Sequence, residues 1–241
     1  MSHFTWMSLL PGIADHTATA TLVMLVLIWL AWTAKKQLSS RPDPVVPDGD
    51  LTIRNIMEIF VEMISGIIRD VLGGRARPFI ALYGCFFLFI LTCNLIGLLP
   101  GFSPPTSNFN VTFALGVFSF LMYNYYGLSI GGMEYVKHFV GPIWWLGVLM
   151  VPLELIDNFV RPLSLSLRLF GNMNGDHLVL GIFTDMTYVL IPVAFYILGL
   201  LVCLIQAFVF TLLSVVYLSL ALPHEDHEHG HGHAAPGHAG H

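Results

Sequence analysis

The sequence RPLSLSLRLFGNMNGDH occupies positions 161–177 and places several polar groups in a chain that is otherwise mostly apolar. Arg168 is the only charged residue between Arg161 and Asp176. A charged side chain within a bilayer is costly, so it is rare there unless it has a task. The first question is therefore whether this stretch lies in a membrane.

The composition answers that question. Hydrophobic residues make up 56% of the 241 residues, charged residues make up 10%, and the mean hydropathy is +0.75. Soluble domains carry about 25% charged residues, so this chain has too few polar groups to cover a globular surface. The sequence predicts an integral membrane protein with room for about five or six spans of about 20 residues. Ten Lys and Arg residues are too few for an extended nucleic-acid surface.

The first apolar run sets the orientation of the chain. Residues 1–34 are predicted to be an external N-terminus and a first span, because Lys35 and Lys36 follow the run and basic residues favour the cytoplasmic side. Residues 35–50 would then be a cytoplasmic linker, whose prolines exclude a helix. An odd number of crossings returns the C-terminus to the cytoplasm.

Residues 51–73 differ from a span because apolar and charged positions recur on opposite sides of a helix. This pattern predicts an amphipathic helix along the cytoplasmic face of the membrane. The alternative is a half-buried helix that packs on a soluble partner. The apolar positions are Ile53, Ile56, Ile59, Phe60, Met63, Ile67 and Val71, and the charged ones are Arg54, Glu58, Glu62, Arg69 and Asp70.

The remaining apolar runs predict a transmembrane hairpin, a cytoplasmic loop and a long tilted helical hairpin, at residues 78–131, 132–142 and 143–222. The first arm of the long hairpin, residues 143–183, would measure about 60 Å as a helix, against a hydrocarbon core of about 30 Å. It must be broken near Pro152 or Pro162, strongly tilted, or both. The fold class is thus all-α, with about five transmembrane helices and one amphipathic interfacial helix.

On a helix with about 100° per residue, the polar groups near Arg168 fall along one side. Asp157 and Arg161 lie within about 20° of Arg168. Three further residues lie within about 40°, namely Glu154, Ser164 and Asn172. Asp176 lies at about 80°, and His177 points toward a neighbouring helix.

Two interpretations of the arginines remain open. In the first, Arg161 and Arg168 are neutralised by Asp157, Glu154 or Asp176 and only hold helices together, as buried charges usually do. In the second, Arg168 faces a partner helix, because no acid lies three or four residues from it. A guanidinium in that place would stabilise the ionised form of a carboxylate on the partner.

Two groups of polar residues then form separate routes to Arg168. Asp176 and His177 lie on the outer side, whereas Glu154 and Asp157 lie on the inner side. Ser164 and two glycines near Arg168 would let a second helix approach closely.

Several motifs of this sequence resemble those of a known protein family. The motif RPLSLSLRLFGNM at 161–173 resembles the core motif of subunit a of the membrane (Fo) sector of rotary F-type ATP synthases. LIQAFVFTLLSVVYLSL at 204–220 resembles the last helix of that family. CNLIGLLPG and FNVTFALG resemble its middle hairpin. The resemblance covers roughly residues 51–222.

The resemblance implies a role for several residues. Arg168 would be the stator arginine that faces the carboxylate of a rotating c-subunit ring, and Gln206 would be its partner on the last helix. Asn94 would lie near the outer half-channel and Glu154 near the cytoplasmic exit, with Asn172 and Asp157 also on the proton path.

The family also implies partners and a location. The partners would be the c-subunit ring, b-type peripheral stalk subunits and membrane lipid. The protein would lie in the bacterial inner membrane. No cofactor is expected, and no nucleotide site, since the chain lacks a phosphate-binding loop motif. The coupling ion is selected by the c subunit; protons are favoured over sodium.

One position departs from the family pattern. The position nine residues after the arginine, a glutamate or histidine in the family, is His177 here. Its usual partner on the last helix would be Gly199, which cannot titrate. Asp176, beside His177, would supply the missing acid.

A metal transporter or metal-sensing membrane protein is the rival interpretation. Residues 223–241 are predicted to be a disordered His-rich cytoplasmic tail, which could bind Zn²⁺ or Ni²⁺ weakly. The alternative for the tail is a solvated end with no such role. The candidate ligands are His224, His227, His229, His231 and His233.

Overall fold

The computed structural model describes residues 15–39, 53–99, 102–140, 144–186 and 190–222, with side chains described outside 38–39, 53, 133–148 and 184–192. Most of the predicted linker at 35–50 and the His-rich tail lie outside these ranges, as do residues 1–14. The described chain consists of α-helices and two short 3₁₀ segments. These are α1 (Asp15–Ser39), α2 (Ile53–Leu72), η2 (Gly73–Arg75), α3 (Ile80–Gly97), η3 (Pro105–Ser107), α4 (Phe109–Val140), α5 (Trp144–Met186) and α6 (Leu190–Ala221).

Four helices are long and apolar enough to cross a membrane: α1, α3, α4 and α6. The fifth long helix, α5, falls outside this group because its polar and charged side chains dilute the apolar residues. The chain is an all-α membrane protein, and the predicted fold class is confirmed.

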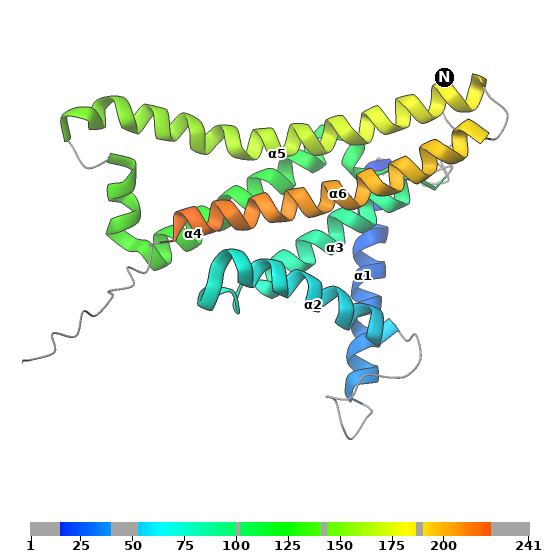
Figure 1. Ribbon diagram of the computed structural model, residues 1–241, viewed down its shortest axis with the longest axis horizontal. Helices are drawn as coiled ribbons and strands as arrows, with labels where there is room; N and C mark the ends of the chain where they lie inside the picture. The colour runs from blue at the N-terminus through cyan, green and yellow to red at the C-terminus, as the bar shows by residue number, and fades with distance from the viewer. Residues whose placement is uncertain (1–14, 40–52, 100–101, 141–143, 187–189, 223–241) are drawn as a thin grey trace, which may run out of the picture.

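Helices α3, α4, α5 and α6 pack around one apolar core (Figure 1). The core contains large side chains that are almost fully buried, such as Tyr83, Ile90, Leu169 and Phe210. Figure 1 shows α5 and α6 running side by side along the longest axis of the molecule, with α1 steeply inclined to both. The outward surfaces of α5 and α6 remain apolar and exposed.

Helix α4 is longer than the sequence predicts. It continues to Val140, where a loop was expected over 132–142. At Gly132 the backbone has φ 50° and ψ −126°, so the helix kinks there and changes direction. Glycine adopts a positive φ at little steric cost, because it has no Cβ. The chain can therefore turn at this one residue and continue as a helix on both sides of it.

Helix α5 runs unbroken from Trp144 to Met186, and both Pro152 and Pro162 lie inside it. The overlong apolar run is therefore a continuous helix that is not broken at either proline. It is about 65 Å long at 1.5 Å per residue. Such a helix fits a hydrocarbon core of about 30 Å only if it is strongly tilted.

Helix α2 has the predicted amphipathic character, but apolar residues occupy two of its faces. Ile64 and Ile68 are buried in the core with α3 and α6. Ile56, Ile59 and Met63 are exposed. Arg54 is only 3% exposed and its Nε donates to Glu58 Oε1 at 2.6 Å, so this charge is held within the helix.

The segment η3 packs against several helices. It contacts α1, α3, α4 and α5, and Pro105 and Thr106 are buried. This short element closes the loop between α3 and α4 and packs beside the polar part of α5.

Candidate functional site

Arg168 lies on α5 with its side chain exposed. Among the described residues it forms no hydrogen bond and no ion pair, unlike Arg161 on the same helix. Its neighbours one turn away on the same face of α5 are Ser164 and Gly171, which are small and exposed. A Cβ added at Gly171 would meet nothing within 4 Å, so the surface beside Arg168 is open.

Gln206 lies on α6 and is only 3% exposed, and it contacts Asn172, which lies one helical turn after Arg168 on α5. Its Oε1 accepts a hydrogen bond of 2.7 Å from Asn172 Nδ2. The structure thus joins Gln206 to Asn172 and does not join it to Arg168. The buried Gln206 Nε2 has no hydrogen-bond partner. An amide oxygen has two lone pairs, so Gln206 Oε1 keeps the capacity to accept from a second donor.

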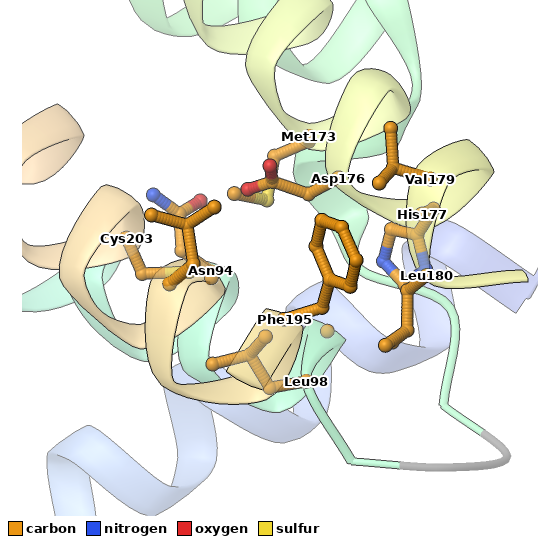
Figure 2. A pocket seen from close by; sticks show the side chains of 12 residues that line it. Asn94, Leu98, Met173, Asp176, His177, Val179, Leu180, Phe195 and Cys203 are labelled. Atoms are coloured by element: carbon orange, nitrogen blue, oxygen red, sulfur yellow. The ribbon is translucent and has the colours of Figure 1, made fainter. Parts of the chain in front are cut away.

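The residues predicted for the outer route, Asn94, Asp176 and His177, line one cavity of about 220 Å³ (Figure 2). The amide of Asn94 on α3 and the carboxylate of Asp176 on α5 turn toward one another across it. His177 lies on the other side of Phe195 in this view. The cavity is large enough for several water molecules, each of which occupies about 30 Å³ in the liquid.

Two atoms in this cavity lack hydrogen-bond partners. Asn94 Nδ2 is a buried donor without an acceptor, and Asp176 Oδ2 is a buried acceptor without a donor. Buried polar groups of native proteins are nearly always hydrogen-bonded to protein or water. Asn94 and Asp176 thus bring unpaired polar atoms to a cavity whose lining is otherwise mostly apolar.

Gly199 also lines the cavity, together with Cys203 of the same helix. A side chain at Gly199 would place its Cβ 2.9 Å from Leu98 Cδ2. The missing titratable partner of His177 is therefore replaced by close packing of α6 on α3. Asp176, one residue from His177, is the acid that lines this cavity.

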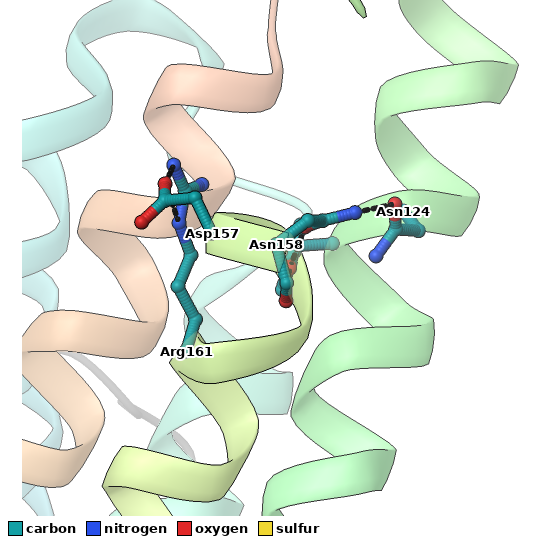
Figure 3. Close-up of polar contacts among 5 residues, drawn as sticks. Asn124, Asp157, Asn158 and Arg161 are labelled. Atoms are coloured by element: carbon teal, nitrogen blue, oxygen red, sulfur yellow. Dashed lines mark hydrogen bonds and ion pairs between the residues drawn. The ribbon is translucent and has the colours of Figure 1, made fainter. Parts of the chain in front are cut away.

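On the inner side, Asp157 and Arg161 form an ion pair, with Arg161 Nη2 at 2.5 Å from Asp157 Oδ2 (Figure 3). This confirms the pairing predicted from their i, i+4 spacing. The guanidinium carbon of Arg161 also lies 5.1 Å from the centroid of the Tyr217 ring on α6. Glu154 lies one turn earlier on α5 and is half-buried.

A polar cluster that sequence reasoning missed joins α5 to α4. Asn158 Nδ2 donates to Asn124 Oδ1 at 3.3 Å (Figure 3). The Tyr123 hydroxyl donates to the Asn158 side-chain oxygen and lies 3.3 Å from the Asn158 backbone oxygen. Pro162, four residues on, has no N–H to offer that carbonyl. This proline was the signal in the sequence, because it predicts an orphan carbonyl that needs a donor from outside the helix.

Within the described ranges, no group of three or more His, Cys, Asp and Glu side chains could hold a metal ion. The histidines of the predicted His-rich tail lie outside those ranges.

Sequence comparisons with known proteins match most of this chain. The sequence profile of the ATP synthase A chain family matches residues 17–219. ATP synthase subunit a of Bdellovibrio bacteriovorus is 40% identical over 226 residues, covering 92% of this chain and 99% of the relative. ATP synthase subunit a of Geobacter sulfurreducens is 43% identical over 205 residues, covering 85% and 86%. Subunit a 2 of Syntrophotalea carbinolica is 43% identical over 211 residues, covering 88% and 87%. The chain therefore belongs to the ATP synthase subunit a family.

Proposed function

We propose that this chain is the stator of the proton channel in a rotary ATP synthase. In this role Arg168 faces a ring of c subunits, and two offset half-channels carry protons to and from the ring carboxylate. The observation that supports this proposal most directly is the state of Arg168. It is an exposed arginine without a partner among the described residues, beside the small exposed residues Ser164 and Gly171 of α5.

The energetics explain why an arginine suits this place. A charge facing hydrocarbon is unfavourable, so the exposed guanidinium needs a partner of opposite charge. A carboxylate on a neighbouring helix supplies it and is itself held in the ionised form while it faces Arg168. Once protonated, the carboxyl is neutral and can turn toward lipid, where an ionised one could not go.

The outer route runs through the cavity of Asn94, Asp176 and His177, and the inner route runs past Glu154 and Asp157. The two sets lie at separate places along α5, so a proton cannot pass directly from one to the other. It has to travel with the ring, and each elementary charge crossing 100 mV supplies about 2.3 kcal/mol. Arg161 is neutralised by Asp157, which leaves Glu154 as the unpaired acid of the inner side.

Gln206 and Asn172 support Arg168 from the side. Asn172 Nδ2 donates to the side-chain oxygen of Gln206 at 2.7 Å, and this oxygen keeps a lone pair for a second donor. The proposal thus gives Gln206 a place beside Arg168, with its contact to Arg168 formed when the ring is present.

The proposed orientation follows from the basic residues. The N-terminus is external, the C-terminus is cytoplasmic, and α2 lies along the cytoplasmic face with its exposed apolar residues toward lipid or a b-type stalk subunit. The chain itself binds no nucleotide; ATP forms elsewhere in the complex.

The test is to replace Arg168 in the assembled complex, reconstituted in vesicles, and to measure ATP synthesis driven by a proton gradient. Arg168→Ala should abolish synthesis, and Arg168→Lys should fail as well, because an ammonium lacks the planar pair of donors. Arg161→Ala is the matched control on the same helix and should retain most of the synthesis. Gradient-driven synthesis that persists in Arg168→Ala at normal assembly would refute the proposal.

A further inference from the structure

The short segment η3 connects two walls of the outer cavity, α3 and α5. Thr106 is fully buried and its Oγ1 donates to Asn94 Oδ1 of α3 at 2.9 Å. Asn174 Nδ2 of α5 donates to the backbone oxygen of Ser107 at 3.1 Å. Pro104 packs so tightly beside α3 that a Cβ at Gly97 would lie 2.6 Å from Pro104 Cβ. One segment thus touches both helices that carry the unpaired cavity atoms.

The hydroxyl of Thr106 holds the Asn94 side chain at the cavity. Thr106 Oγ1 donates to Asn94 Oδ1, and Asn94 lines the cavity together with Asp176. Asn94 Nδ2 and Asp176 Oδ2 are both buried without a hydrogen-bond partner. Because Thr106 is fully buried, its hydrogen bond fixes the position of a polar side chain beside the Asp176 carboxylate.

We propose that Thr106 is a positioning residue of the outer proton path, whose hydroxyl fixes the Asn94 side chain in the cavity beside the Asp176 carboxylate. This inference rests on the proposed role of the cavity as the outer half-channel. Thr106 itself does not line the cavity, so it does not exchange protons with the path directly. It acts through Asn94 alone.

Another buried threonine, Thr112, is the matched control for a purely structural role of the hydroxyl. Thr112 is also fully buried, but its Oγ1 donates to the backbone oxygen of Phe109 at 3.0 Å, inside the first turn of α4. Substituting valine removes the hydroxyl at nearly constant shape in both cases. Only at Thr106 does the substitution release a side chain that lines the cavity.

The experiment uses the complete complex in vesicles and measures passive proton conduction through its membrane part at a fixed potential. Thr106→Val should lower conduction on the order of fivefold, as expected from loss of one buried hydrogen bond that fixes the group. Thr106→Ser keeps the hydroxyl and should restore conduction to within about twofold of the original. Thr112→Val should leave conduction unchanged. If Thr106→Val reduces the amount of assembled complex, Thr106→Ala serves in its place and is compared with Thr106→Ser.

A second readout separates positioning from general weakening of the loop. In an Asn94→Ala background, Thr106→Val should produce no further loss, because the group that Thr106 orients is already gone. Equal fold-losses in the presence and absence of Asn94 would overturn the inference, as would normal conduction in Thr106→Val.

The same series separates this inference from the proposed function. If Asn94→Ala and Asp176→Asn lower conduction while Thr106→Val does not, the outer path stands and only the role of Thr106 is refuted. If neither Asn94→Ala nor Asp176→Asn changes conduction, the cavity is not the outer path, and the role of Thr106 falls with it.

Discussion

Replacing Tyr123 by phenylalanine tests how α5 stays continuous through Pro162. The Tyr123 hydroxyl of α4 donates to the side-chain oxygen of Asn158, and it lies 3.3 Å from the Asn158 backbone oxygen, which receives no N–H from Pro162. Tyr123 is 2% exposed, so water does not replace the lost hydroxyl easily. An unsatisfied buried acceptor costs about 1–3 kcal/mol. We therefore expect Tyr123→Phe to lower the free energy of unfolding by about 2 kcal/mol.

Tyr83→Phe is the matched control. The Tyr83 hydroxyl lies 3.3 Å from the backbone oxygen of Ser214, and Tyr83 is 1% exposed. Ser214 lies inside α6, where the N–H of Leu218 is placed to bond the same oxygen. Loss of the Tyr83 hydroxyl thus leaves no orphan acceptor, and the cost should be about 1 kcal/mol or less.

The assay is thermal unfolding followed by the reaction of buried thiols with a fluorescent maleimide. Cys93 and Cys203 are 0% and 1% exposed and should react only when the helices separate, whereas Cys85 is exposed and gives the starting signal. At about 2–4 °C per kcal/mol for a chain of this size, Tyr123→Phe should lower Tm by about 4–8 °C. Equal shifts for Tyr123→Phe and Tyr83→Phe would refute the reasoning about Pro162.

Two further predictions concern packing and charge. Gly116→Ala should destabilise the fold by at least about 1–3 kcal/mol, because the new Cβ would lie 2.7 Å from the backbone oxygen of Pro162; Gly84→Ala, which meets nothing within 4 Å, should be neutral or stabilising in the same thiol assay. Asp157 and Arg161 should show a coupling of about 1 kcal/mol or less in a double-mutant cycle of thermal unfolding, since the side chain of Asp157 is 54% exposed. A coupling several times larger would show that the pair is a buried structural link.

The periodicity and spacing of the sequence predict the helices and the side-chain pairs within one helix. The length of the apolar run predicted an overlong α5, and the i, i+4 spacing predicted the pair of Asp157 and Arg161; both follow from the geometry of a single helix. The loop expected after residue 131 was wrong because a helix kinked at Gly132 and a loop contain the same polar residues and glycines.

The contacts between different helices and loops could not be predicted from periodicity or spacing. Thr106 reaches Asn94, and Tyr123 reaches Asn158, across sequence separations of 12 and 35 residues. No periodic pattern links these positions, since they depend on how the helices pack. Pro162 was the only local sign, because a proline inside a helix always frees one carbonyl.

The polarity of α5 has a consequence for how the protein is made. Its charged side chains include Glu154, Asp157, Arg161, Arg168 and Asp176, and each acidic or basic residue near the middle of an isolated helix costs about 2.5–3.5 kcal/mol to insert from the translocon. The helix is not apolar enough to partition by itself, whereas α6 is among the most apolar spans of the chain. Biogenesis therefore has to deliver the two as a pair, with α6 drawing α5 into the bilayer, and α5 cannot reach its place until synthesis has passed the last span.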